Sequence, residues 1–316
     1  MLAAFSTTYA AGLVTGGVLG DRYGTRRLFR AGAAGYLVGC VVCALAPGPA
    51  VLVGGRALQG LAAAAMVPQA FALTAIAGPA AYHRLAAVLG AASVTGQLAA
   101  VVSGGSWRVL FVIQAAATVV MLVRPGRFPP AAGGRGDVAG LVLGILVPLS
   151  VLGPLVVVRL TGGPAWILLG TVAVAPLGWA YRRRGRAVFA GRAAVLAASG
   201  TGVAYACQAV LLLLTALRPD VHPLVPVGYG AAFALFSVLR RPVVLAAVAV
   251  PALILTVAAG YPGGLLVVCG AAMGVVLPRL TATALTGSVP GAAAGTLATI
   301  PQFAAAAALT VSAGVL

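Results

Sequence analysis

The charged side chains that could do chemistry are few, and the strongest motif that contains them lies in residues 16–28, GGVLGDRYGTRRL. Asp21 can accept hydrogen bonds from backbone N–H groups at the first turn of a neighbouring helix, where the helix dipole also favours a carboxylate. Gly20 and Gly24 permit a sharp reversal and a close backbone approach. The arginines of this run are predicted to hold it at the lipid headgroups. They are Arg22, Arg26 and Arg27.

A second candidate is Arg56, within LVGGRALQGLAAAAMVPQ at residues 52–69. An arginine inside an apolar span costs about 2.5–3.5 kcal/mol on insertion scales, so it is a functional candidate by default. Gln59 lies one helical turn away on the same face, which favours a functional pair. The alternative is that Arg56 snorkels to the outer surface, because it lies only a turn or two from that end of its span.

The cysteines and histidines do not form a site by their spacing. Cys40 and Cys43 form a C-x-x-C inside an apolar run without a charge to activate a thiol, and they are interpreted as small packing residues. The four Cys and two His share no spacing typical of zinc ligands. His83, beside Arg84, is expected in a solvated loop, and His222 in another loop. No metal site, cofactor or enzyme activity is predicted.

Polar side chains inside apolar spans can line a substrate cavity or form hydrogen bonds between helices, and the sequence leaves both alternatives open. They are Gln69, Gln97, Tyr205, Gln208 and Gln302. Proton coupling in a membrane usually needs an intramembrane carboxylate. The acidic residues all fall at loops or span ends, so none is expected to face a cavity. They are Asp21, Asp137 and Asp220.

The elements that position these residues must be membrane-spanning helices. Hydrophobic residues make up 62% of the chain and charged residues 7%, whereas a typical soluble domain has about 25% charged residues. All 20 basic residues are arginines that punctuate apolar runs, so the formal charge of +17 does not predict nucleic-acid binding. Arg22 is the first of them, so no basic segment precedes the first apolar run and no cleavable signal peptide is predicted.

Twelve apolar spans are predicted, and most have the length of about 20 residues that a bilayer demands. They cover 2–20, 28–47, 50–77, 85–104, 107–123, 137–158, 164–181, 188–214, 223–239, 242–260, 263–285 and 292–316. Backbone groups in lipid must be satisfied internally, so each span is predicted to be a helix. The fold class is therefore all-α, a polytopic transmembrane helical bundle of about 12 helices.

The distribution of arginine over the connecting loops supports this count. When the loops alternate sides, with the loop after the first span inside, most arginines fall inside and only Arg108, Arg159 and Arg218 fall outside. This asymmetry is typical of cytoplasmic loops and places both termini outside. Gly12, Gly16 and Gly20 recur every four residues in the first span, which predicts close packing against a neighbouring helix.

The run at residues 16–28 resembles the loop signature of the major facilitator superfamily, G-x-L-x-D-R-x-G-x-R-R, which in that family joins helices 2 and 3. The matching positions are Gly17, Leu19, Asp21, Arg22, Gly24, Arg26 and Arg27. Residues 52–69 are similar to the family's helix 4 motif with R-x-x-Q-G, at Arg56, Gln59 and Gly60. The resemblance implies a gating role for the loop signature and a role for the helix in coupling protons to substrate.

Residues 90–114 resemble the helix 5 region of drug:proton antiporters, although Gly96 is followed by Gln97 where the antiporters have proline. The SWR-x-x-F turn remains, from Ser106 to Phe111. Residues 291–314 resemble a late helix of the branch with 14 transmembrane helices, and two extra spans separate the halves as in that branch. The chain is then expected to lack the first and last helices. The expected domains are 1–123 (helices 2–6), a linker at 124–187 with two helices, and 188–316 (helices 9–13).

The resemblance implies a multi-pass plasma membrane protein that exports lipophilic or cationic drugs and antibiotics by proton antiport. Its expected partners are the lipid bilayer, a small-molecule substrate and protons, and it is expected to be a monomer. Two alternatives remain: a transporter for one specific metabolite, and a truncated or degenerate relative without transport. The absent carboxylates favour the degenerate relative, whereas the retained Asp21 loop and the motif of Arg56, Gln59 and Gly60 oppose it.

Overall fold

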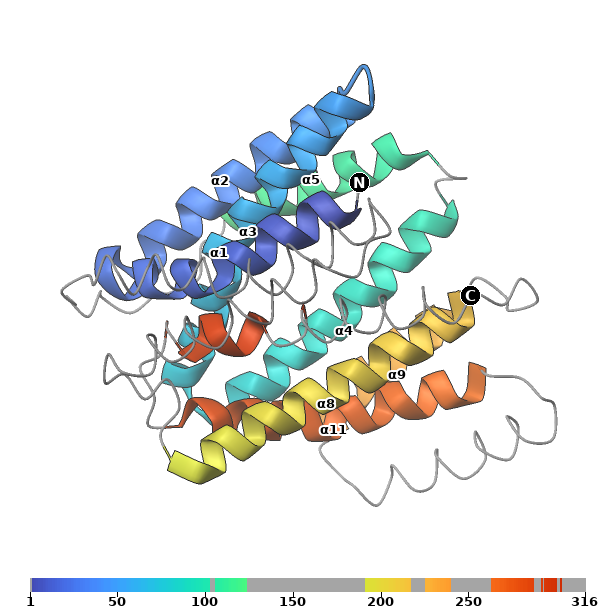
Figure 1. Cartoon of the computed structure of the whole chain (residues 1–316). Helices are drawn as coiled ribbons and strands as arrows, with labels where there is room; N and C mark the ends of the chain where they lie inside the picture. Colours follow the sequence, from blue (N-terminus) through green and yellow to red (C-terminus); the bar gives the residue numbers. More distant parts are fainter. Residues whose placement is uncertain are drawn as a thin grey trace, which may run out of the picture.

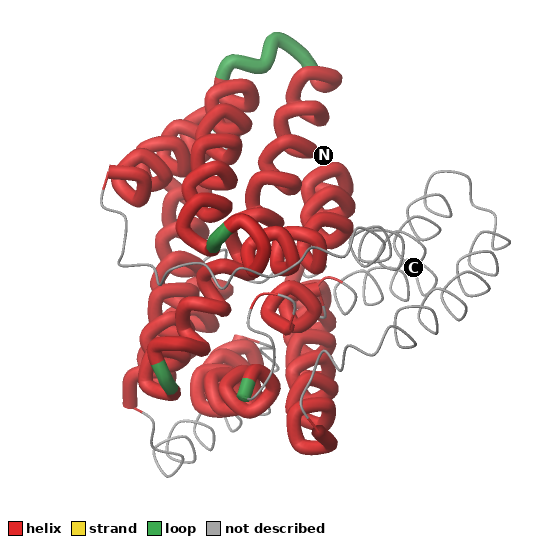
Figure 2. The backbone as a smooth tube through the Cα atoms, turned by 90° about the vertical axis from the view of Figure 1, so that its left-hand side faces the viewer, coloured by secondary structure: helices red, strands yellow, loops and turns green. Residues whose placement is uncertain are grey.

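The computed structural model describes residues 2–102, 106–123, 191–216, 225–239, 263–286, 293–299 and the single residues 291 and 302. Every regular element in these ranges is a helix (Figure 2). The helices are α1 (Leu2–Tyr23), α2 (Thr25–Ala44), α3 (Pro49–Ala77), α4 (Pro79–Val102), α5 (Trp107–Val123), α8 (Gly191–Ala216), α9 (Val225–Leu239) and α11 (Gly263–Leu285). Residues 291 and 293–299 are also helical and are called the 291–299 segment below.

The described helices coincide with predicted spans, and the all-α fold class is confirmed. The bounds of α5 and α11 are those predicted. Within the described ranges, three segments are long and apolar enough to cross a bilayer, namely Thr25–Ala44, Pro49–Ala75 and Gly264–Leu285. The predicted spans at 137–158, 164–181 and 242–260 lie outside the described residues, so the expected linker domain and the full count of helices stay predictions.

Two of the turns between consecutive helices are shorter than predicted. Gly24 alone separates α1 from α2, and Gly78 alone separates α3 from α4. Both glycines have a positive φ, 99° and 90°, a backbone conformation that other residues rarely adopt. A proline suits the first position of a helix because its missing N–H would lack a partner there, so α4 begins at Pro79 and not near residue 85.

The early start of α4 corrects one prediction about His83. This residue does not lie in a solvated loop: it is half-buried in α4, and its Nδ1 lies 3.2 Å from the carbonyl oxygen of Ser237 on α9. Arg84, its neighbour, is exposed. The other histidine, His222, lies outside the described residues.

The helices form two groups with α4 between them (Figure 1). The first group consists of α1, α2, α3 and α5, and the second of α8, α9 and α11. Although α4 follows α3 directly in the chain, it packs mainly against α9 and also against α11. The 291–299 segment packs against α1, since Ala298 shares a buried cluster with Leu13.

Small residues allow α1 and α3 to lie in close contact, as the glycine spacing predicts. Gly16 faces the carbonyl oxygen of Ala64, and a side chain at position 16 would collide with it. Pro68 lies four residues after Ala64 within α3 and has no N–H to bond that carbonyl. The kink-forming proline and the glycine stripe therefore meet at one point of the interface between α1 and α3.

Candidate functional site

The loop signature joins the first group of helices to the 291–299 segment. Asp21 lies in the last turn of α1, and its Oδ1 accepts a hydrogen bond of 3.1 Å from the backbone N–H of Gly291. Gly291 is the first described residue of that segment. Backbone N–H groups in the first turn of a helix lack helical acceptors, and the positive end of the helix dipole favours a carboxylate. The prediction that Asp21 accepts a hydrogen bond from a backbone N–H of another helical segment is confirmed, whereas the start of that segment lies outside the described residues.

Glycines bring the two backbones together beside this hydrogen bond. Gly17 is buried and faces the carbonyl oxygen of Gly291 and the Cα of Gly295. Gly295 in turn faces the carbonyl oxygen of Leu13. A Cβ at any of these glycines would displace the backbone opposite. The loop signature thus combines a charged hydrogen bond with direct backbone packing between segments far apart in the sequence.

The arginines of the loop signature point away from this contact. Arg22, Arg26 and Arg27 are all exposed. The guanidinium carbon of Arg22 lies 5.0 Å from the ring centre of Tyr23, within the range of a cation–π contact. Their predicted role at the lipid headgroups stays a prediction.

Arg56 is the centre of a second site, on α3. Its Nη1 donates a hydrogen bond of 3.0 Å to Oε1 of Gln59, the partner predicted from the spacing. The guanidinium carbon lies 4.5 Å from the ring centre of Phe5 on α1 and 5.8 Å from that of Phe111 on α5. Within the described residues, these partners are neutral, so they leave the positive charge of Arg56 without a balancing carboxylate.

Gln59 extends this site into a buried polar network. Its side chain is 0% exposed, and its Nε2 lies 3.0 Å from Sγ of Cys40 and 3.5 Å from Oε1 of Gln114 on α5. The hydroxyl of Tyr36 donates to the same Gln114 oxygen at 3.1 Å. Because buried polar groups are costly unless they are paired, these contacts hold α2, α3 and α5 in one arrangement. We call the set the arginine network. Its members are Tyr36, Cys40, Cys43, Arg56, Gln59 and Gln114.

Sequence reasoning missed part of this network. Cys40 and Cys43 are buried, as expected of packing residues, but both also contact the side chain of Gln59. The signal for the missed residues was present: Tyr36 and Cys40 are four residues apart on one helix face, and Gln114 is a polar residue in an apolar span.

Gly60 allows the approach of α1 that brings Phe5 over Arg56. A side chain at position 60 would collide with the hydroxyl of Thr8 and the carbonyl oxygen of Phe5. Thr8 Oγ1 also bonds the carbonyl oxygen of Ala57 at 3.0 Å, across the same interface. The predicted motif of Arg56, Gln59 and Gly60 therefore acts as a unit: two residues form polar contacts, and the third sets the distance between the helices.

The helix 5 motif lies in α4 and forms fewer contacts. Gly96 is exposed, with open space where a side chain would stand. Gln97 donates to Oγ of Ser93 at 3.0 Å within α4, and its own Oε1 is buried without a partner among the described residues. The arrangement gives no specific role to this pair, which stays a prediction.

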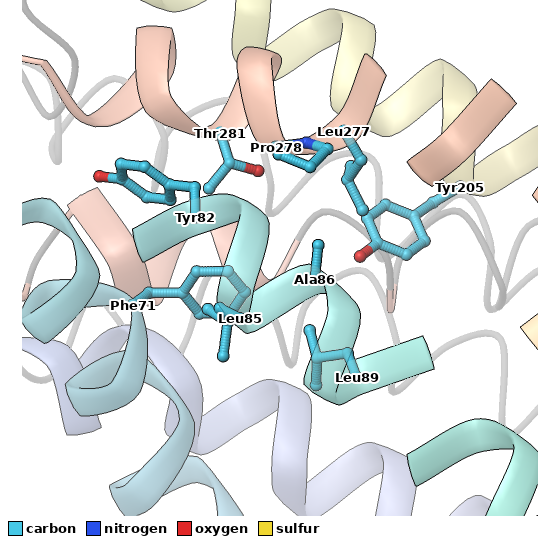
Figure 3. Close-up of a pocket in the computed structure, with 9 residues that line it drawn as sticks. All are labelled: Phe71, Tyr82, Leu85, Ala86, Leu89, Tyr205, Leu277, Pro278 and Thr281. Carbon is cyan, nitrogen blue, oxygen red and sulfur yellow. The ribbon is translucent and has the colours of Figure 1, made fainter. Parts of the chain in front are cut away.

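The predicted lining residues are distributed over different places. Gln69 is 0% exposed and packs between α3 and α1. Tyr205 lines a cavity of about 20 Å³ between α3, α4, α8 and α11, large enough for about one water molecule. Figure 3 shows Tyr205 and Leu277 beside Ala86 and Leu89 of α4. Gln302 is helical and half-buried, whereas the side chain of Gln208 lies outside the described part.

A larger groove of about 500 Å³ runs along α1 and α3. Its lining is apolar except for the hydroxyl-bearing residues of α1, which sequence reasoning did not single out. They are Thr7, Thr8 and Thr15. Thr8 links the groove to the arginine network, since it also bonds α3 next to Arg56.

The first turn of α5 is also held by a side-chain contact. Arg108 Nη2 donates a hydrogen bond of 2.9 Å to the carbonyl oxygen of Ala46, directly after α2. The guanidinium carbon lies 4.4 Å from the ring centre of Trp107, which packs edge-on against Phe111. The SWR-x-x-F turn thus fixes the start of α5 to the end of α2.

Comparison with known proteins identifies transporters and drug-resistance proteins to which part of this chain is similar. No family model matches the chain. A probable actinorhodin transporter of Streptomyces coelicolor is 33% identical over 179 residues, which is 51% of this chain and 31% of that protein. A multidrug resistance protein B homolog of Mycobacterium tuberculosis is 33% identical over 141 residues, 41% of this chain and 26% of that protein. An MFS-type transporter of the same species is 31% identical over 137 residues, 40% of this chain and 23% of that protein.

The alignments thus cover less than a third of the length of each of these relatives. The relatives are named as transporters, and the described part of the chain is a bundle of apolar helices. The protein is a multi-pass protein of the plasma membrane. With the loop signature and the arginine motif in the arrangement described above, the chain is similar, over 40–51% of its length, to transporters that include an MFS-type transporter and a multidrug resistance protein homolog.

Proposed function

We propose that this protein exports lipophilic or cationic small molecules, including antibiotics, by proton antiport, in the branch with 14 transmembrane helices. The names of the relatives support export: one is called an actinorhodin transporter and another a multidrug resistance protein homolog. The observation that carries the proposal is the hydrogen bond between Asp21 and the N–H of Gly291.

The hydrogen bond supports this proposal because of the segments that it joins. Transporters with two helical halves work by opening and closing contacts between the halves around a central site. Asp21 belongs to the proposed domain 1–123 and Gly291 to the proposed domain 188–316. A contact of one charged acceptor, one N–H donor and facing glycines can break and reform without unfolding either half. The loop signature is therefore proposed as the gate at the arginine-rich, cytoplasmic side.

The arginine network is the proposed coupling site. Arginine stays charged at every physiological pH, so Arg56 supplies a fixed positive charge inside the bundle. Its described partners are neutral amide and ring groups, which leaves the charge able to repel a cationic substrate or attract an anionic group as the site changes state. The groove lined by Thr7, Thr8 and Thr15 lies next to this network and is the proposed path of a lipophilic substrate.

Uptake of ethidium, a lipophilic cation, into inverted membrane vesicles tests this function. In these vesicles, export by the protein appears as accumulation of ethidium inside. The accumulation requires a vesicle interior that is more acidic than the medium, and it raises the interior pH because protons leave in exchange. An Asp21→Asn variant, inserted at the same level, is expected to reduce the rate several-fold. The absence of gradient-dependent accumulation of ethidium and of a panel of anionic and neutral antibiotics, by protein shown to be folded, would contradict the proposal.

A further inference from the structure

A histidine lies at the contact between α4 and α9, which belong to opposite halves of the chain. His83 Nδ1 is 3.2 Å from the carbonyl oxygen of Ser237, so a titratable side chain of α4 lies within hydrogen-bonding distance of the second group of helices. The two helices are packed along each other, as Gly90 of α4 faces the backbone of Ala234 (Figure 1). A movement of α4 relative to α9 would therefore change this contact.

The acceptor lies at a defined place in the second half. Ser237 is 0% exposed and lies near the end of α9, the end at which a helix dipole is negative. Its hydroxyl donates to the carbonyl oxygen of Phe233 at 2.7 Å and lies 3.3 Å from that of Gly274 on α11. Pro278 leaves the Gly274 carbonyl without its helical donor. Ser237 is thus fixed between α9 and α11.

The protonation state of His83 decides how well it binds this carbonyl. A neutral imidazole donates from Nδ1 in only one of its two tautomers, and in the other tautomer Nδ1 presents a lone pair to the carbonyl. Protonation makes Nδ1 a donor in every molecule and adds a positive charge at the negative end of α9. The geometry therefore favours the contact when His83 is protonated.

The surrounding helices carry charged and titratable residues, but none of those described is a second histidine or a carboxylate. Among the described residues, the helices packed against α4 carry arginine, cysteine and tyrosine but no carboxylate, and on α4 itself Arg84 is exposed and Tyr82 is buried. Those on the neighbouring helices are Arg56, Arg108, Tyr229, Cys269 and Arg279, and Tyr205 of α8 packs beside Ala86 of α4. Histidine is the side-chain type of this set that can both accept and donate a proton at a ring nitrogen.

We propose that His83 is a proton-binding site at the cytoplasmic junction of the two halves, and that its protonation holds α4 against α9. Arg84 and the arginines of the loop signature place this end of the bundle at the cytoplasm by the positive-inside rule. Acidification of the cytoplasm then stabilises the closed junction, and a rise in pH releases it and admits substrate. This use of the contact rests on the proposed transport function, whereas the contact and its pH dependence do not.

The distance between the two helix ends tests the proposal directly. Val88 on α4 and Val238 on α9 are 63% and 64% exposed, so spin labels attached to cysteines at both positions will disturb little packing. Cys207 and Cys269 are replaced by alanine, and the buried Cys40 and Cys43 are checked for absence of labelling. Double electron–electron resonance in lipid nanodiscs between pH 8 and pH 5.5 is expected to show about a fivefold rise in the ratio of short to long distances.

Two variants separate a specific effect from a general one. His83→Asn keeps an N–H donor near the Nδ1 position but cannot change charge, so its distance distribution should not respond to pH. Arg84→Gln removes the neighbouring exposed charge and should leave the response unchanged. A flat response in the unaltered protein, or a response that persists in His83→Asn, would overturn the proposal.

Transport assays on the same variants separate this proposal from the proposed function. A pH-dependent distance without gradient-dependent accumulation of ethidium or of any antibiotic of the panel would remove the proposed function and leave the His83 site standing. Accumulation with a pH-independent distance would remove the His83 site alone. With both intact, His83→Asn should retain transport while flattening its dependence on cytoplasmic pH.

Discussion

The side-chain amide of Gln69 on α3 donates a hydrogen bond of 2.8 Å to the carbonyl oxygen of Gly16 on α1. A Cβ on the same glycine would meet the carbonyl oxygen of Ala64, which Pro68 deprives of its helical donor. Gln69 itself is fully buried, and its Oε1 has no partner among the described residues. One glycine therefore receives a polar contact and a backbone contact from the same neighbouring helix.

Replacement of Gln69 by alanine should destabilise the bundle by about 1–2 kcal/mol, because an interhelical hydrogen bond in a membrane contributes about 0.6–1.7 kcal/mol and a cavity adds to the loss. The measurement is unfolding in mixed micelles of dodecyl sulfate. Leu61→Ala is the control on the same helix, since Leu61 is 58% exposed. Equal losses in the two variants would show that the contact with Gly16 contributes nothing.

Replacement of Gly17 by alanine should open the junction between α1 and the 291–299 segment. The new methyl group would collide with the carbonyl oxygen of Gly291, and overpacking of this kind costs about 1–3 kcal/mol. The matched control is Gly96→Ala, because nothing lies within 4 Å of the Cβ that would be added there. The measurement is the yield of cross-linking between one cysteine on each side of this junction. The yield is expected to fall in Gly17→Ala and to stay constant in Gly96→Ala.

Replacement of Asp21 separates charge from hydrogen bonding. Asp21→Asn keeps an oxygen acceptor for the N–H of Gly291 and loses the favourable charge, a loss of about 0.3–1 kcal/mol. Asp21→Ala loses both, about 1.5–3 kcal/mol for a hydrogen bond to a charged group. Transport rates should follow the order Asp, Asn, Ala. A reversed order of Asn and Ala would argue against the role of Asp21 as an acceptor.

Replacement of Arg56 tests the arginine network. Arg56→Lys keeps the charge but loses the planar group that bonds Gln59 and faces Phe5, so transport is expected to fall about tenfold. Arg56→Gln should abolish proton-linked transport while the protein still folds, because the remaining network is neutral. Arg84→Gln, at an exposed arginine, serves as the control. Full activity of Arg56→Gln would exclude Arg56 from coupling.

The sequence was sufficient to locate the described helices, apart from the start of α4, and to pair Arg56 with Gln59, because spans of about 20 apolar residues and spacings of three residues have direct structural meanings. It also indicated the correct type of partner for Asp21, since a carboxylate in a tight loop seeks backbone N–H groups. That the partner is Gly291, 270 residues away, depends on the packing of the whole bundle.

The predicted position of His83 in a loop was wrong. Histidine next to arginine, between two apolar spans, is typical of a loop, and the expected start of the span at residue 85 followed from that assumption. The structure shortens the connection to Gly78 alone and moves His83 into α4. Likewise, Tyr36 and Gln114 lie on different helices, so only their tertiary contact, with the tyrosine hydroxyl 3.1 Å from the amide oxygen, joins them to the arginine network.

The position of α4 has a consequence for synthesis of the protein. Its main neighbour, α9, begins at Val225, more than a hundred residues after α4 ends at Val102. At a translation rate of about 5–20 residues per second, the ribosome needs on the order of ten seconds to produce that neighbour. During this interval α4 can pair only with the helices already inserted or with lipid. Assembly of this bundle therefore includes an interval in which α4 is inserted before its main partner exists. During that interval, insertion factors or the smaller contacts of α4 with α3 and α5 must prevent it from pairing with other helices.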